Sequence, residues 1–119
     1  MRNNKLGRLY RDGEIVINKG DEGTCLFVIQ AGKVEVFDQN GEGEVKIAEL
    51  GSGEFFGEMG LFEKDVRSCT VRASGNTKIL TIDKKNFYKT IQKDPTLAYR
   101  LLQKMSFRLR ELNKKVTQA

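Results

Sequence analysis

Residues 24–50 read TCLFVIQAGKVEVFDQNGEGEVKIAEL, and this stretch decides the fold class. Apolar side chains occupy alternate positions in three runs, which begin at Cys25, Val34 and Val45. A period of two is typical of strands that bury one face. The letters AGK predict a tight turn after the first run, and DQNGEG predicts a hairpin loop with Asn-Gly at its tip. The stretch therefore predicts three short strands joined by turns.

Strand patterns continue on both sides of this stretch, from residue 14 to residue 82. Upstream, EIVINKGDEG predicts a strand that stops at its glycines. Downstream, RSCTVRA and TKILTI predict two strands joined by an SGN turn. Many short strands separated by glycine turns are typical of a β-sandwich or barrel, so the sequence predicts one of these architectures.

The pattern changes from a period of two to a helical period at Asp83. DKKNFYKTIQKD starts with this aspartate as an N-cap and places its apolar residues on one face. The pair Asp94-Pro95 ends that helix and starts another, because proline is favoured in the first turn of a helix. The sequence therefore predicts helices over residues 83–94 and 95–117.

The last predicted helix carries an apolar stripe with spacings of four and three, which is the heptad pattern of a coiled coil. Beyond about Leu109, little of the β domain remains to cover this stripe, so a second copy of the helix is the expected partner. The alternative is a helix that lies back on its own barrel. The predicted homodimer contacts are Ala98, Leu102, Met105, Leu109, Leu112 and Val116.

The composition excludes several classes of function. A chain of 119 residues fits a single domain with one core, residues 1–119. The absence of histidine removes the commonest general base and most zinc and haem ligands, and two isolated cysteines cannot form a Cys-rich metal site. We therefore expect a protein that is not an enzyme and that has no metal and no other cofactor.

Charge and hydropathy limit the location and the partners of the chain. The sequence has no apolar run long enough to span a membrane, and MRNNKLGRLY lacks the apolar core of a signal peptide, so we expect a cytoplasmic protein without membrane attachment. The net charge is +5, but the basic residues gather in the last helix among acidic ones, without a basic arm or helix-turn-helix unit. The expectation is a solvated basic face with no direct nucleic-acid partner, although the charge also suits small anions.

Residues 51–62, GSGEFFGEMGLF, place four glycines around a turn. Glycines let the backbone bend tightly, and exposed amides at a turn or helix start can bind an anion. Arg67 follows at the start of a strand, where its guanidinium can pair with a phosphate, and Glu58 can accept a hydrogen bond from a sugar hydroxyl. Ser68 either donates to that phosphate or simply begins the strand. The alternative for the two charges is a structural Glu58–Arg67 ion pair.

Residues 56–73, FGEMGLFEKDVRSCTVRA, resemble the phosphate-binding cassette of cyclic nucleotide-binding domains and are most similar to that of the bacterial catabolite activator family. The likeness covers almost the whole chain. It implies a mainly β fold: an eight-stranded-type antiparallel β-roll, or double-stranded jelly roll, over residues 14–82, with the cassette at residues 55–70. The β-roll is preceded by a helix or turn over residues 1–13 and followed by two helices, of which the last is a long dimerisation-type helix.

The resemblance also implies a ligand, cAMP or cGMP, and a role for each cassette residue. Glu58 takes the ribose 2′-hydroxyl, Arg67 neutralises the cyclic phosphate, and amides after Gly57 together with the Ser68 hydroxyl complete the anion site. Apolar walls come from Leu61, Val45 and Val71. The implied ligand-binding residues are Gly57, Glu58, Met59, Leu61, Arg67, Ser68, Cys69, Val71 and Asn113.

The sequence departs from the family pattern at two sites. Cys69 stands where the family usually has a small alanine, and Leu112 and Asn113 stand where the last helix of the activator offers two hydroxyls to the purine. Asn113 can bond a purine edge or can simply be an exposed polar residue, so the base preference stays open. The sequence also lacks the activator's helix-turn-helix domain, so we expect no transcription-factor activity from this chain alone.

These features together predict a stand-alone regulatory module that senses a cyclic nucleotide and relays the signal through residues 83–95 to its last helix and an unidentified effector protein. Two alternatives stay open: a scaffold of the same fold that has lost its ligand, and a sensor of another anionic metabolite. A cupin-type enzyme is disfavoured, because that fold normally holds its metal with histidines.

Overall fold

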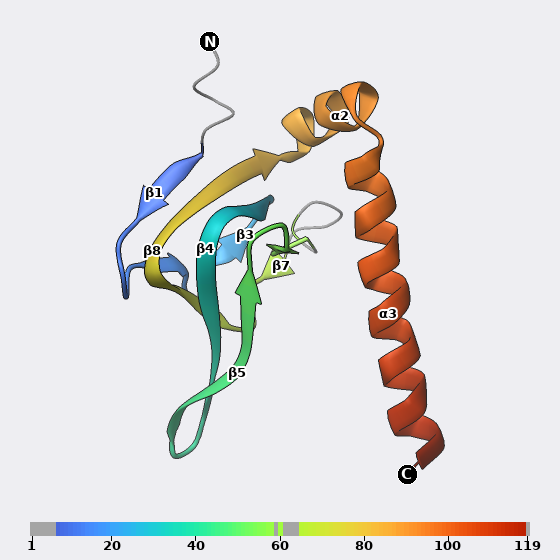
Figure 1. The fold of residues 1–119 in the computed structure, drawn as a ribbon. Coiled ribbons are helices and arrows are strands. Elements are labelled where there is room, and N and C mark those ends of the chain that lie inside the picture. Colours follow the sequence, from blue (N-terminus) through green and yellow to red (C-terminus); the bar gives the residue numbers. More distant parts are fainter. Residues whose placement is uncertain (1–6, 59, 61–64, 119) are drawn as a thin grey trace. The chain divides into compact units, whose positions relative to one another are not determined.

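The computed structural model describes residues 7–58, residue 60 and residues 65–118. It divides into two compact units, a β unit over residues 1–84 and a helical unit over residues 85–119 (Figure 1). Within the described part of the chain, no helix is long and apolar enough to cross a membrane.

The β unit is built from antiparallel strands, as predicted. The larger sheet has the order β1-β8-β4-β5, with β2 also paired to β8 and β6 also paired to β4, and a smaller sheet joins β3 to β7. The mainly β fold followed by two helices is confirmed. The strands of the described residues are β1 (Arg8–Tyr10), β2 (Ile15–Ile17), β3 (Glu22–Gly23), β4 (Cys25–Asn40), β5 (Gly43–Gly51), β6 (Phe55–Phe56), β7 (Asp65–Val66) and β8 (Thr70–Asp83).

Two predicted turns are wrong, because the chain bends there without reversing. The AGK segment lies inside β4, and the SGN segment lies inside β8. Gly32 and Gly75 have φ values of +88° and +75°, which side chains rarely adopt, so both strands bend at glycine. β4 and β8 pair with each other on both sides of the bends, from Cys25↔Asp83 to Phe37↔Thr70. Pairing along two long bent strands takes the place of two separate hairpins.

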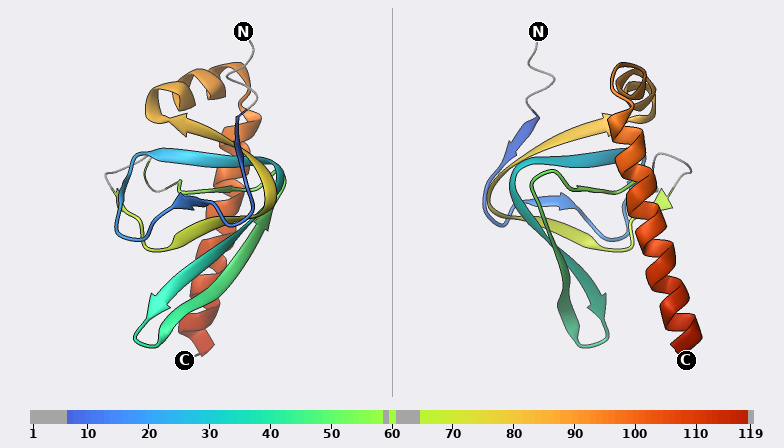
Figure 2. Two further views of the ribbon diagram at one scale, coloured as in Figure 1. Left: turned by 90° about the vertical axis from the view of Figure 1, so that its left-hand side faces the viewer. Right: turned by 45° about the vertical axis from the view of Figure 1, so that its right-hand side comes forward.

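The predicted hairpin at DQNGEG is confirmed. β4 and β5 pair from Lys33↔Gly51 to Asn40↔Gly43, so the tip consists of Gly41 and Glu42 rather than the predicted Asn-Gly pair. Both views of Figure 2 show this hairpin extending away from the rest of the β unit. Val45 and Ile47 of β5 are exposed on it, so their alternating pattern does not bury them.

The core of the β unit is a cluster of aliphatic and aromatic side chains from five strands, β1, β2, β4, β6 and β8. It sits between β2, β4 and β8, and partly buried residues such as Val16 and Val36 pack against it. Thr77 is buried beside it, and its hydroxyl donates to the carbonyl of Lys33 at 2.9 Å, which satisfies the buried polar group. The cluster contains Tyr10, Ile17, Ile29, Val34, Phe56, Val71, Ala73 and Ile79.

The segment predicted as a helix or turn over residues 1–13 contains a strand, which the prediction missed, followed by a turn at Asp12 and Gly13. Residues 1–6 lie outside the described part of the chain. Residues 8–10 form β1, which pairs with β8 through Arg8↔Ile79, Leu9↔Lys78 and Tyr10↔Thr77. Main-chain hydrogen bonding to β8 and burial of Tyr10 outweigh the weak local preference of this short polar segment for a helix or turn.

The two helices are α2 (Lys84–Lys93), whose first residue still belongs to the β unit, and α3 (Thr96–Gln118). Asp94 lies between them, and its carboxylate accepts a hydrogen bond from the amide of Thr96 at 3.0 Å. This contact satisfies an amide that has no partner within the helix, as an N-terminal capping residue does. The break between the helices at Asp94-Pro95 is therefore confirmed.

The cap at Asp94 predicts a pH-dependent contribution to stability. Hydrogen bonds from the Thr96 side chain and then from its amide lower the pKa of Asp94 from its ordinary value of 3.8. Since the folded pKa is depressed, this stabilisation is present above pH 3.8 and is lost as the pH falls through the folded pKa. The urea midpoint of the wild type should exceed that of Asp94→Ala at about pH 6, and the difference should shrink below about pH 3. An equal difference at both pH values would contradict the assignment.

The predicted heptad positions lie along α3. Leu102 and Leu109 are 66% and 62% exposed, whereas Ala98 and Met105 are half-buried. The side chains of Leu112 and Val116 lie outside the described part. The homodimer stays a prediction.

Candidate functional site

The main chain of Arg67 is tied to the segment that precedes β4. Its amide donates to the carbonyl of Asp21 at 2.8 Å, and its carbonyl accepts from the amide of Gly20 at 2.8 Å. Directly before Arg67, strand β7 pairs with β3 through Glu22↔Val66 and Gly23↔Asp65. The position of the Arg67 main chain is therefore fixed by a segment that lies more than forty residues earlier in the sequence.

The guanidinium of Arg67 is buried, with 7% of the residue exposed, and is held by main-chain carbonyls. One terminal nitrogen donates to the carbonyl of Gly57 at 3.0 Å, and the other donates to the carbonyl of Cys25 at 2.8 Å. Its carbon also lies 5.8 Å from the centre of the Phe27 ring. A buried charge is costly unless it is hydrogen-bonded, and these contacts offset part of that cost. A guanidinium has five donors, so two such bonds leave donors that an anion can accept.

Gly57 forms the turn that brings a carbonyl to Arg67. Its φ of +78° lies in the left-handed region, which favours glycine. A Cβ atom at this position would lie 3.0 Å from a terminal nitrogen of Arg67 and 3.2 Å from the Phe27 ring. Phe56, the residue before this turn, stacks on Phe27 with ring centres 5.1 Å apart and anchors the turn to β4.

Glu58 directly follows this turn and is buried, with 2% of the residue exposed. Among the described residues, Glu58 and Arg67 are the only charged side chains that are buried. Charged side chains are rarely buried without a reason in structure or function. The fold therefore places one acid and one base out of solvent within a single short stretch of the chain.

The other residues predicted for the site fall in several places. Ser68 is exposed, and its hydroxyl donates to the Cys69 sulfur at 3.8 Å. Val71 is buried in the β-unit core, and Asn113 is exposed on α3 in the helical unit. The predictions for Met59 and Leu61 lie outside the described residues.

A recess of about 190 Å³ lies beside Arg67 in the β unit. Its lining comes from the end of β2, from β3 and from the start of β4, and includes Ile17, Asn18, Asp21, Gly23, Cys25 and Phe27. In the sequence, residues 20–25 indicate only the end of one strand and the start of the next. The signal in the sequence is the pair of glycines in KGDEG, which can mark a close approach of another part of the chain.

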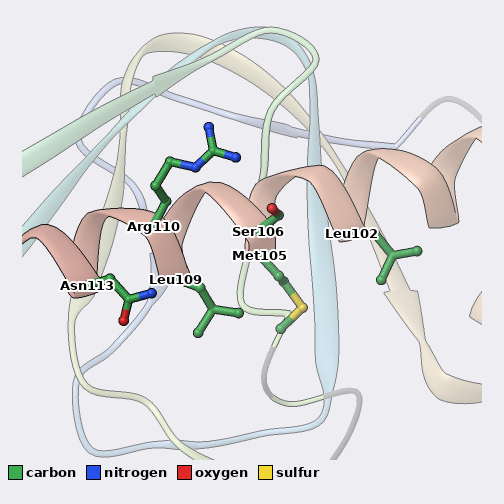
Figure 3. A pocket seen from close by; sticks show the side chains of 6 residues that line it. All are labelled: Leu102, Met105, Ser106, Leu109, Arg110 and Asn113. Atoms are coloured by element: carbon green, nitrogen blue, oxygen red, sulfur yellow. The ribbon is translucent and has the colours of Figure 1, made fainter.

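On α3, a shallow hollow is lined by apolar residues and by polar ones. Figure 3 shows the side chains of Leu102, Met105 and Leu109 on one side of the helix, together with Asn113, whereas Arg110 points to the other side. Three of the predicted heptad residues, Leu102, Met105 and Leu109, thus share one side of the helix with Asn113. In the part of the chain that the structure describes, no group of three or more Cys, Asp or Glu side chains is arranged to hold a metal ion.

The β unit is an antiparallel β-roll in which a glutamate and an arginine are buried beside a glycine turn. This arrangement is typical of ligand-binding β-rolls, and two helices follow it in the chain. The family model for the cyclic nucleotide-binding domain matches residues 7–94, and the chain belongs to this family. The resemblance noted from residues 56–73 is thereby confirmed.

Two curated relatives and one solved structure show the likeness in more detail. The chain is 35% identical over 105 residues to the cyclic AMP receptor protein of Thermus thermophilus, covering 87% of this chain and 49% of the relative. It is 37% identical over 114 residues to the cAMP-activated global transcriptional regulator Vfr of Pseudomonas aeruginosa, covering 92% and 53%. The crystal structure of the Thermus thermophilus catabolite activator protein matches with a TM-score of 0.80 and 34% identity, over 92% of this chain and 52% of that one. The chain spans about half the length of these relatives.

Proposed function

We propose that this chain is a regulatory module that binds cAMP or cGMP through residues 55–70 and relays binding to its C-terminal helices. The observation that carries the proposal is the buried guanidinium of Arg67, oriented by the carbonyls of Gly57 and Cys25 beside the buried Glu58. A desolvated guanidinium with donors to spare suits a phosphate diester. The relatives named as cAMP receptors and cAMP-activated regulators support this choice of ligand.

In this proposal each cassette residue recognises a different part of the nucleotide. Arg67 neutralises the cyclic phosphate, and Glu58 accepts a hydrogen bond from the ribose 2′-hydroxyl. Amides of the turn that starts at Gly57, together with the Ser68 hydroxyl, bind the remaining phosphate oxygens. Cys69 contributes the adjoining surface and Asn113 contacts the base, whereas Val71 is buried in the core.

The output of the module is proposed to run through the helices. A ligand shifts a conformational equilibrium only by its difference in affinity for the two states. Residues 83–95 connect the β unit to α3, where Leu102 and Leu109 are exposed and suit a second copy of the helix. We therefore place the response in a homodimer through α3 and in an effector protein that reads it.

The test of this function is isothermal titration of the folded chain with cAMP and with cGMP, each at two protein concentrations. Saturable heat with either nucleotide is expected, and a dependence of affinity on protein concentration would link binding to the dimer. The proposal would be contradicted if neither nucleotide gave heat with protein whose circular dichroism shows a folded β domain. Displacement of a fluorescent cyclic nucleotide by another anionic metabolite would then identify a different ligand.

Glu58→Gln is expected to weaken cAMP binding by roughly 10- to 150-fold, since a hydrogen bond to a charged group contributes about 1.5–3 kcal/mol. The matched control is Glu54→Gln, which changes an exposed glutamate of the same segment and should bind as the wild type. Titration with 2′-deoxy-cAMP assigns the contact to the ribose. The deoxy ligand should bind the wild type weakly and should bind Glu58→Gln no worse than cAMP does, and a further loss in that variant would place the 2′-hydroxyl elsewhere.

A further inference from the structure

Gly23, the last residue of β3, lies directly against the side chain of Arg67. A Cβ atom at Gly23 would lie 1.9 Å from Nε and 2.0 Å from Cζ of Arg67, far inside van der Waals contact. Gly23 is not among the glycines with a positive φ, so the backbone conformation does not itself require glycine here. The space that a side chain would fill is occupied by the guanidinium.

The main chain at Gly23 is held from two other directions. Its strand pairs with β7 through Gly23↔Asp65, immediately before Arg67. On another side, a Cβ atom at Gly60 would lie 2.8 Å from the Gly23 carbonyl oxygen, so the turn after Gly57 is packed closely on this strand. A side chain at residue 23 therefore cannot be accommodated by a retreat of β3, and the guanidinium has to move instead.

Movement of the guanidinium breaks the contacts that orient it. The hydrogen bonds to the carbonyls of Cys25 and Gly57 are 2.8 Å and 3.0 Å long, and a shift of more than about 1 Å removes both. The charge then lies in a buried site without these acceptors or leaves the site altogether.

We propose that Gly23 is a positioning residue for Arg67, and that its missing side chain lets the guanidinium rest on β3 and face an anion in a fixed orientation. The consequence for nucleotide affinity rests on the proposed function. The steric coupling between Gly23 and Arg67 does not, because it acts in the protein without ligand.

The coupling is tested by a double-mutant cycle in stability. Urea midpoints are measured for the wild type, Gly23→Ala, Arg67→Ala and the double variant. We expect Gly23→Ala to lower the midpoint in the wild-type background and to leave it unchanged or raise it in the Arg67→Ala background, where the space is open. Gly41→Ala is the matched control, because it has a non-positive φ and no heavy atom within 4 Å of its Cβ position. An equal effect of Gly23→Ala in both backgrounds would overturn the proposal.

A second experiment measures the affinity of Gly23→Ala for cAMP and cGMP by isothermal titration. A decrease of about tenfold or more is expected, with Gly41→Ala binding as the wild type. Wild-type affinity in Gly23→Ala would overturn the positioning role even if the stability cycle shows coupling. If the wild type itself binds neither nucleotide, the proposed function fails, while the stability cycle still decides whether Gly23 and Arg67 are sterically coupled.

Discussion

Arg67→Ala is expected to weaken cAMP binding by roughly 30-fold to several thousand-fold, which corresponds to about 2–5 kcal/mol. The reason is that the variant leaves the phosphate without the one buried cationic side chain among the described residues of the site. The measurement is isothermal titration, with circular dichroism as the check that the β unit is folded. The affinity of Arg67→Lys for cAMP should lie between those of the wild type and Arg67→Ala. An ammonium keeps the charge but cannot bond two carbonyls and an anion in the geometry of a planar fork.

Arg8→Ala is the control for this prediction. Arg8 lies on β1, and its side chain is mostly exposed and pairs with Glu14 at 3.1 Å. A surface ion pair of this kind contributes little, so the affinity for cAMP should stay at the wild-type value. If Arg67→Ala also bound cAMP as tightly as the wild type, the phosphate would have to lie elsewhere in the molecule.

Ile29→Ala is expected to lower the free energy of unfolding by about 2–5 kcal/mol, the range for removing a large aliphatic side chain from a packed core. Ile29 has no exposed surface and lies in β4 between β6 and β8, where it pairs with Ile79. Urea unfolding followed by circular dichroism measures the loss. The midpoint should fall without a large change in the denaturant slope.

Ile47→Ala is the matched control, because it removes the same atoms from another strand of the same sheet. Ile47 is 55% exposed on the β4–β5 hairpin, so the loss should be much smaller, about 1 kcal/mol or less. Similar losses for the two isoleucines would show that the hairpin is covered in solution, for example by a second copy of the chain.

The sequence predicts the class of fold and the residues of the cassette because both depend on local patterns. Alternating apolar residues and glycines indicate strands, and the change of period at Asp83 and the Asp94-Pro95 pair indicate the two helices. The spacing of Glu58 and Arg67 leaves a ligand site and a structural ion pair open, and the resemblance of FGEMGLFEKDVRSCTVRA to the cassette favours the ligand site. In these cases the information lies within a few residues of the feature it predicts.

Local sequence patterns could not show that AGK and SGN form bends within strands rather than turns between strands. A glycine between two alternating runs is compatible with a hairpin and with a bent strand. The choice depends on whether the two runs pair with each other or with a third segment. In this chain β4 and β8 pair with each other across both bends, and that pairing joins residues far apart in the sequence.

The sequence by itself determined the antiparallel β architecture, the two helices and the identity of the buried acid and arginine. Only the tertiary structure decided how the arginine is held: Arg67 donates to the carbonyl of Cys25, 42 residues earlier, and lies on Gly23. Carbonyl acceptors occur at every residue, so no pattern of side chains marks the ones that a guanidinium will reach. The reason is physical, because the orientation of Arg67 is set by packing between β3, β4 and the turn at Gly57, and that packing exists only once the strands are paired.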